Sequence, residues 1–248
     1  MKSRLASLIL NSLMAVLMVF GTVTTGYVPV SAMTGNEMSS GVPSNTTHDP
    51  VDTMESTVIG DGAAASGTGA PTSSSVSFSV TTGTGTDRLM LVGVSWNCGT
   101  TNRTVSTATF TPSGGSAVDL TLVITQLNTW TTNNYRYTAI YSLLAPPSGV
   151  TGTVAITFSG AVSNGIIAGA ANFAGVDQAN PLGTPVGAAG TGTSTSGTPN
   201  PSLSLTGLTG DELIFDSVFL GANSTSQLMS ADSGQTEAWN VLGYSSSS

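Results

Sequence analysis

Residues 75–80 read SVSFSV, a strict alternation of serine with valine or phenylalanine. Successive side chains of a β-strand point to opposite faces, so this stretch predicts a strand with an apolar face in a core and a hydroxyl face in solvent. Residues 152–158, GTVAITF, repeat the pattern with Val154, Ile156 and Phe158 on one side. Two half-exposed strands of this kind are typical of a sandwich.

Other apolar runs lack alternation. Residues 89–92 (LMLV) and 213–215 (LIF) are continuously apolar, which indicates strands covered on both faces. Short segments of this kind recur with turn residues between them, and no stretch after residue 32 has a helical repeat, so we expect an all-β fold, a jelly-roll-like antiparallel β-sandwich. The expected strands are 57–59, 75–80, 88–96, 106–110, 119–127, 135–144, 152–158, 165–173, 202–205 and 212–220. The expected core contains Val76, Phe78, Val80, Leu91, Ile156, Phe158, Leu213 and Phe215. Residues 187–201 are expected to form a long loop.

The N-terminal segment has the pattern of an export signal. Lys2 and Arg4 precede an apolar stretch over 5–20, and Val30-Ser31-Ala32 supplies small residues for cleavage. We therefore predict a signal peptide over 1–32, a flexible linker over 33–56 and a β-sandwich domain over 57–248. The alternative is an uncleaved membrane anchor, against which Asn11 and the shortness of the run argue. After cleavage no membrane span is expected, and the protein would be secreted or held at the cell surface.

The composition limits the partners. Of 248 residues, 38 are Thr, 35 are Ser and 30 are Gly, whereas only 7% are charged. Removal of Lys2 and Arg4 would leave three basic residues against 13 acidic ones. Clustered Lys and Arg, which nucleic-acid binding requires, do not occur. An acidic, lysine-free surface favours neutral partners such as uncharged glycans.

The sequence offers few groups for catalysis. His48 lies in the linker, so a Ser-His-Asp or Cys-His arrangement within the domain is not expected, and Cys98 is expected to be a small buried hydrophobe. Asp216 falls in an apolar strand, but Glu212 on the same face would lie roughly 13 Å away, too far for a glycosidase pair. No cofactor is expected. Calcium held by turn oxygens, for example of Asp177 or Asp211, is the one candidate, although no loop motif for it occurs.

Aromatic residues mark a candidate glycan site. Sugar rings pack on aromatic faces, and the loop between residues 127 and 135 is flanked by such rings and amides. The predicted ligand-binding residues are Trp130, Asn133, Asn134, Tyr135 and Tyr137. Tyr135, Tyr137 and Tyr141 recur at period two, which a buried core row would also show. Trp130 could equally fold back over the end of the sandwich, and Trp239 is expected to pack in the sandwich.

Four strings occur in a familiar order: DRLMLVGVS (87–95), YSLLAPPSG (141–149), FAGVDQANPLG (173–183) and GQTEAWN (234–240). Together they resemble an uncharacterised β-sandwich domain of large secreted or cell-surface proteins of bacteria and archaea. The resemblance implies no catalytic residues. It also implies one or two further closing strands after residue 240, so the sandwich is expected to be C-terminally truncated unless the terminal serines are a polar tail.

Three functions follow as hypotheses. The leading one is a non-catalytic surface or adhesion module that binds neutral glycans. The second is a structural spacer of a larger surface protein. The third is a carboxylate-based glycosidase or lyase-like jelly roll, which would need two converging carboxylates in a cleft.

Overall fold

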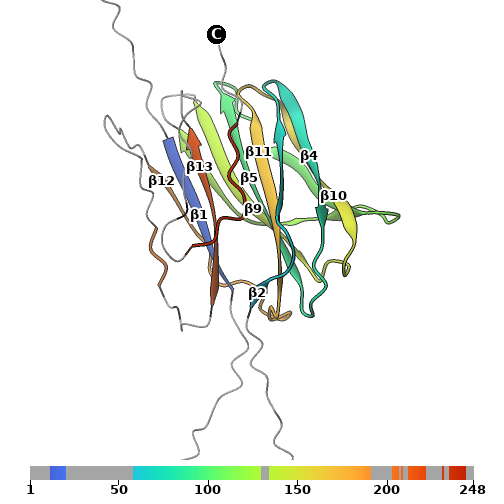
Figure 1. Cartoon of the computed structure of the whole chain (residues 1–248). Helices are drawn as coiled ribbons and strands as arrows, with labels where there is room; N and C mark the ends of the chain where they lie inside the picture. The colour runs from blue at the N-terminus through green and yellow to red at the C-terminus, as the bar shows by residue number, and fades with distance from the viewer. Residues whose placement is uncertain are drawn as a thin grey trace, which may run out of the picture.

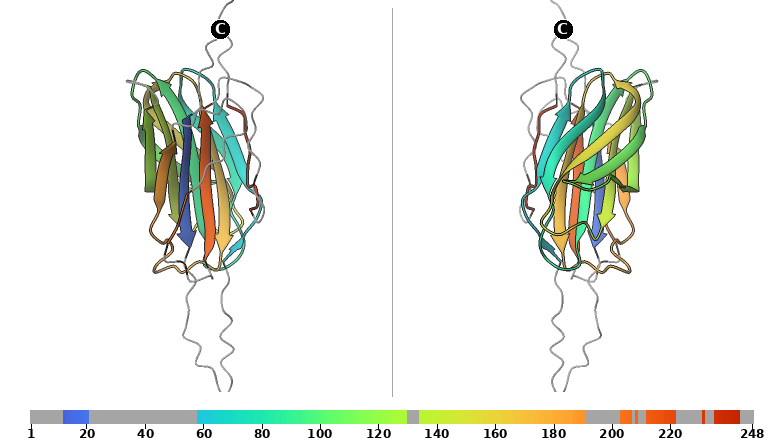
Figure 2. Two further views of the ribbon diagram at one scale, coloured as in Figure 1. Left: turned by 90° about the vertical axis from the view of Figure 1, so that its left-hand side faces the viewer. Right: turned by 90° about the vertical axis from the view of Figure 1, so that its right-hand side faces the viewer.

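The computed structural model describes residues 12–20, 58–129, 134–190, 203–206, 208, 212–221, 231 and 235–243. All strand pairs in this part of the chain are antiparallel, and it contains no helix, hence none that could cross a membrane. The strands form a four-stranded and a six-stranded sheet, with a three-stranded sheet on the far side of the six-stranded one (Figures 1 and 2). The predicted all-β sandwich is confirmed.

The four-stranded sheet carries the alternating sequences. Its order is β4 (Ser73–Thr81), β10 (Thr151–Val162), β6 (Val105–Pro112) and β7 (Val118–Asp119). Val154 of β10 lies opposite Phe78 on β4 and Phe110 on β6, so the apolar residues of three strands share one row. This inner face is buried, and the hydroxyl-bearing face of the same strands is turned to solvent.

The six-stranded sheet is covered on both faces. Its order is β2 (Ile59–Gly60), β11 (Ile166–Ala174), β5 (Leu89–Gly99), β9 (Tyr135–Leu144) and β8 (Thr121–Thr129), with β3 (Ala65–Gly69) also paired to β11. Met90 and Val92 of β5 pack toward the four-stranded sheet, whereas Leu89 and Leu91 pack toward the three-stranded sheet. None of these four side chains is exposed. The continuously apolar run 89–92 is therefore a central strand, as predicted.

The third sheet has the order β12 (Val186–Gly190), β1 (Ser12–Phe20) and β13 (Leu213–Gly221). Phe215 of β13 packs edge-on against Phe173 of β11, with ring centroids 5.9 Å apart. Its middle strand, β1, comes from the apolar stretch of the predicted signal peptide. Cleavage after Ala32 stays a prediction, and the predicted linker 33–56 lies outside the described residues.

Two core clusters result, one on each face of the six-stranded sheet. Seven of the eight predicted core residues are buried, and Leu213 is half-buried at the margin of the outer cluster. Full burial of a side chain such as Ile156 contributes about 1.5–3 kcal/mol. Packing of this extent on both faces makes the six-stranded sheet the centre of the molecule.

Two paired glycines let a tryptophan lie close to the six-stranded sheet. Gly93 of β5 is opposite Gly169 of β11. A Cβ atom at Gly169 would be 2.4 Å from Cδ2 of Trp239, and one at Gly93 would be 3.1 Å from Cζ2 of the same ring. Trp239 is half-buried in the outer cluster beside Phe215. The predicted packing of Trp239 is confirmed.

Several predicted boundaries are wrong. The loop predicted at 187–201 begins with the strand β12, and residues 203–205, predicted as part of a strand, are not in one. The single strand predicted at 119–127 is divided into β7 and β8 at Leu120, whose amide bonds to Ala108. β3 was not predicted, because its sequence ASGTG lacks apolar alternation. Gly67 of this strand permits close contact with Phe78, since a Cβ atom at position 67 would be 2.8 Å from the Cβ atom of Phe78.

Candidate functional site

Tyr137, one of the predicted ligand-binding residues, lies in the inner core. It is 8% exposed, and its ring stacks on Trp96 at 4.7 Å with an interplanar angle of 10°. Its hydroxyl donates to Oδ1 of Asn102 at 2.8 Å, and burial raises the pKa of the phenol. Both rings belong to the inner core, so Tyr137 exposes little surface, and its contact with a sugar stays a prediction.

The rest of the predicted loop site is only partly described. Tyr135 is half-buried against the inner core, and Asn134 is half-buried beside it. The Oδ1 atom of Asn134 is buried and accepts no hydrogen bond. Trp130 and Asn133 lie outside the described residues, so a glycan site that uses them stays a prediction.

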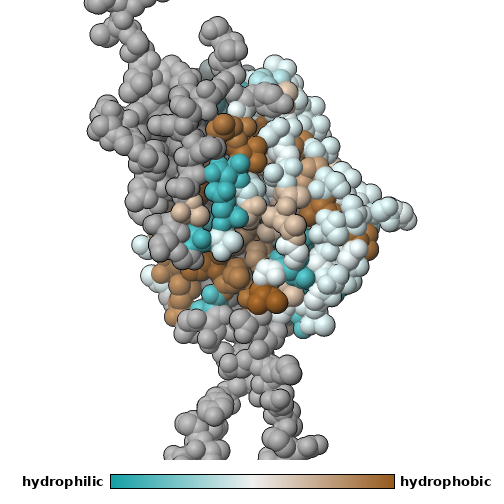
Figure 3. All heavy atoms as spheres, viewed as in Figure 1, coloured by the Kyte–Doolittle hydropathy of each residue, from teal (hydrophilic) through white to brown (hydrophobic). Residues whose placement is uncertain are grey.

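The most regular polar surface is the solvent face of the four-stranded sheet, which we call the hydroxyl face. Its strands β4, β10 and β6 place side chains in four rows across the sheet. The rows are Thr81 and Thr151; Ser79, Thr153 and Thr111; Ser77, Ala155 and Thr109; and Ser75, Thr157 and Thr107. This side of the molecule, turned to the viewer on the right of Figure 2, is pale in the hydropathy view of Figure 3.

No charged side chain interrupts these rows. Asp119 of β7 lies opposite Thr109, at the edge strand of the sheet, and is the first carboxylate beyond them. Thr81 and Thr151 bond to each other through their hydroxyls at 2.8 Å, and the Ser79 hydroxyl donates to the carbonyl of Gly152 at 3.3 Å. The alternating sequence of β4 and β10 predicted the hydroxyls. The third strand of the hydroxyl face is β6, whose alternation over residues 107–109 (TAT) was not recognised from the sequence.

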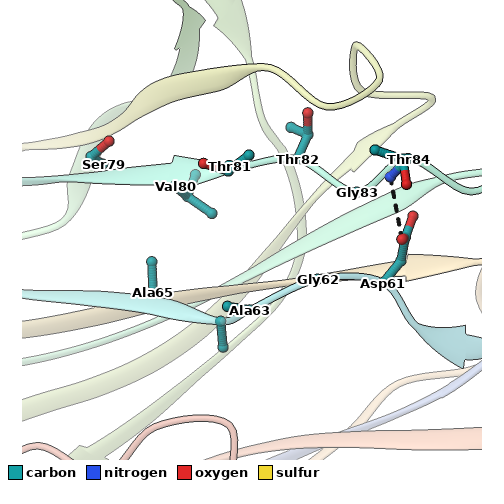
Figure 4. A pocket seen from close by; sticks show the side chains of 11 residues that line it. Asp61, Gly62, Ala63, Ala65, Ser79, Val80, Thr81, Thr82, Gly83 and Thr84 are labelled. Atoms are coloured by element: carbon teal, nitrogen blue, oxygen red, sulfur yellow. Dashed lines mark hydrogen bonds between the residues drawn. The ribbon is translucent and has the colours of Figure 1, made fainter.

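An open pocket of about 500 Å³ lies at one end of the hydroxyl face (Figure 4). Ser79 and Thr81 belong to both the pocket and the hydroxyl face. The other lining residues come from the segment before and into β3, from β4 and from the turn after it; they are Asp61, Gly62, Ala63, Ala64, Ala65, Val80, Thr82, Gly83 and Thr84. Its size lies within the range of small-molecule sites.

Asp61 is the only ionisable residue of this pocket. Its carboxylate accepts hydrogen bonds from the amides of Thr84 at 3.2 Å and Gly85 at 2.9 Å. A Cβ atom at Gly83 would be 2.0 Å from the carboxylate, so only glycine allows the turn to close around it. Asp61 therefore fixes this turn, and the remaining lone pairs of its oxygens can accept further donors.

The other carboxylates considered from the sequence do not converge. Asp216 is exposed on β13, and Asp177 accepts a hydrogen bond from its own turn, at Ala179 N, which lowers the pKa of that carboxyl. Among the described residues no group of three or more His, Cys, Asp or Glu could hold a metal ion. Asp211 is outside the described residues, so calcium stays a prediction. Cys98 is buried in the inner core, as expected, and burial raises the pKa of its thiol.

Arg136 is a residue whose setting the sequence analysis missed. It lies on β9, within the predicted strand 135–144, and is 8% exposed. The period-two row Tyr135, Tyr137 and Tyr141 could have indicated this, because it places Arg136 on the opposite, covered face of the same strand.

No family model matches the chain, and no match is found among curated proteins or solved structures. The functional argument therefore rests on the residues described above.

Proposed function

We propose that this protein is a secreted, non-catalytic module that acts at the cell surface and adheres to neutral glycans through the hydroxyl face. One observation carries the proposal. Ten Ser and Thr side chains are held in register over β4, β10 and β6 without a charged residue among them.

The geometry of the sheet favours an extended ligand. Neighbouring strands are about 4.8 Å apart, and alternate residues of one strand are about 7 Å apart, so the hydroxyls form a regular array. Each hydroxyl can donate and accept, as can each hydroxyl of a sugar. A single hydrogen bond contributes about 0.5–1.5 kcal/mol net, so one sugar unit would bind weakly and a polymer that spans several rows would bind more tightly.

The charge of the chain favours the same class of ligand. With the predicted signal removed, the chain has 13 acidic and three basic residues. This negative charge disfavours the binding of anionic polymers. The pocket beside Ser79 and Thr81 would accept a chain end or branch, where Asp61 could receive a sugar hydroxyl.

Removal of hydroxyls without loss of shape tests the proposal. Valine replaces threonine with little change in volume and is well suited to strands. We expect the triple variant Thr107→Val, Thr153→Val and Thr157→Val to bind a panel of immobilised neutral polysaccharides at least tenfold more weakly than the unmodified protein. The matched control, Thr121→Val with Thr125→Val at two exposed positions of β8, should bind as before.

Two outcomes would contradict this proposal. If the triple variant and the control variant bind the polysaccharides equally well, the hydroxyl face is not the binding site. Loss of binding in Trp130→Ala, with the triple variant unaffected, would place the site in the predicted loop instead. If the unmodified protein binds none of the polysaccharides, the spacer function is favoured. The absence of aromatic side chains from the described pocket lining would agree with that result.

A further inference from the structure

Two of the three guanidinium nitrogens of the buried Arg136 have no hydrogen-bond partner. Its Nε and Nη1 atoms are inaccessible to solvent and donate no hydrogen bond, and no carboxylate of the described residues pairs with it. Buried charged groups in folded proteins are normally paired, because desolvation of a lone ion is costly. Burial also lowers the pKa of this guanidinium. The arrangement indicates that an anionic group belonging to this site is missing.

Arg136 lies on the face of the six-stranded sheet that the three-stranded sheet covers. Asn128 of β8 and Asn97 of β5 are its neighbours in register. The adjacent row contains Thr138 and Ser95, whose hydroxyls bond to each other at 3.0 Å. One end of this covered face is therefore polar, unlike the apolar end around Leu89 and Leu91.

The middle strand of the covering sheet, β1, lies against β8 and β9, the strands of Asn128 and Arg136. Its sequence, SLMAVLMVF, contains no acidic residue, so it cannot supply the missing anion. β1 also belongs to the predicted signal peptide. Its removal would leave β12 and β13 with unpaired edges, which β1 fills over five residues of β12 and nine of β13.

We propose that the position of β1 is a strand-acceptor site. In the exported protein it is filled by an extended, largely apolar polypeptide segment from outside residues 33–248, and this segment carries one carboxylate that pairs with Arg136. Main-chain hydrogen bonds to β12 and β13 supply affinity, as in other cases of strand addition to a sheet edge. The charge pair supplies specificity.

The register locates the carboxylate. Val16 of β1 is opposite Gly187 and Ser217. A Cβ atom at Gly187 would be 2.8 Å from Oε1 of Gln126, and one at Gly93 would be 2.8 Å from Oγ of Ser217. Register position 16 thus lies near the rows of Gly93 and Gln126, and the row of Gln126 is the neighbour of the Arg136 row.

The direction of β13 then selects position 14. Phe215 contacts Phe173 near the start of β5, and Ser217 lies over Gly93 farther along, so Phe219 is next toward Asn97. Position 14 of β1 is opposite Phe219. A carboxylate at position 14 of the incoming strand therefore comes closest to the Arg136 row, whereas position 15 belongs to the opposite face of the strand.

Peptide binding tests the proposal on protein recovered after export. The probes are two synthetic peptides with the sequence of residues 12–20 and solubilising ends, one with the Met14→Glu change and one with Ala15→Glu. We expect the first to bind at least tenfold more tightly than the second. In the Arg136→Met variant this preference should disappear.

Three results would overturn the proposal: equal affinity of both peptides, a preference that survives in Arg136→Met, or exported protein that still contains residues 12–20. The full chain provides a check that does not need peptide binding. There, Met14→Glu should raise the melting temperature relative to Ala15→Glu, and the difference should vanish when Arg136 is methionine. None of these measurements involves glycan binding, so failure here and failure of the hydroxyl face are distinguishable.

Discussion

Tyr141 should make the stability of the protein depend on pH in a defined alkaline window. The residue is 8% exposed in the inner core, and burial raises the pKa of its phenol to about 12 from the usual value of 10. In the unfolded chain the phenol ionises at about pH 10, whereas in the folded protein it keeps its proton until about pH 12. Between these values the unfolded state binds fewer protons, so the free energy of unfolding falls as pH rises.

The magnitude follows from the two pKa values. One pKa unit corresponds to about 1.4 kcal/mol, so a difference of about two units costs about 3 kcal/mol well above pH 12, of which about 2 kcal/mol is reached at pH 12. The assay is denaturant unfolding of the unmodified protein and Tyr141→Phe over pH 8 to 12. The difference between the two proteins removes the contributions of other groups, including Tyr137. We expect a constant difference up to pH 9.5 and a relative gain of about 2 kcal/mol for Tyr141→Phe by pH 12. A difference that stays constant throughout would refute the burial assigned to Tyr141.

Three further predictions concern packing and processing. Ile156→Ala should lower the free energy of unfolding by about 2–5 kcal/mol, whereas Leu144→Ala, at an exposed position, should change it by about 0.5 kcal/mol or less; denaturant midpoints would show this. Gly169→Ala should destabilise by about 1–3 kcal/mol, because its Cβ would meet Trp239, and most of this cost should vanish in a Trp239→Ala background; an undiminished cost there would place the strain elsewhere. N-terminal sequencing of secreted protein should show cleavage after Ala32, and recovery of intact chain in the membrane fraction would contradict it.

The sequence predicted the strands whose side chains alternate or are continuously apolar. For β4 and β10 the period of two is explicit, and for the start of β5 the apolar run required cover on both faces. β3 and β12 were missed because their sequences, ASGTG and VGAAG, lack large apolar side chains. Their small residues instead let the backbone lie close to neighbouring side chains. Propensity carries little information about such segments.

The site was harder to predict because it depends on register between distant strands. Nothing local distinguishes Tyr135 from Tyr137, yet Tyr137 is buried and stacks on Trp96, whereas Tyr135 is half-buried. The same holds for the hydroxyl face, which needs β6 to be placed beside β10. The burial of Arg136 was not predicted, because a charged residue next to a polar loop usually faces solvent, whereas the alternation of β9 turns this one under the third sheet.

The hydroxyl face is tested most directly by mapping a soluble neutral oligosaccharide onto the protein by NMR. Backbone amide shifts should change along β4, β10 and β6, with the largest changes beside Ser77, Thr153 and Thr157, while β8 and β9 stay unaffected. Shift changes confined to the residues around Tyr135, or none at saturating oligosaccharide, would contradict the account.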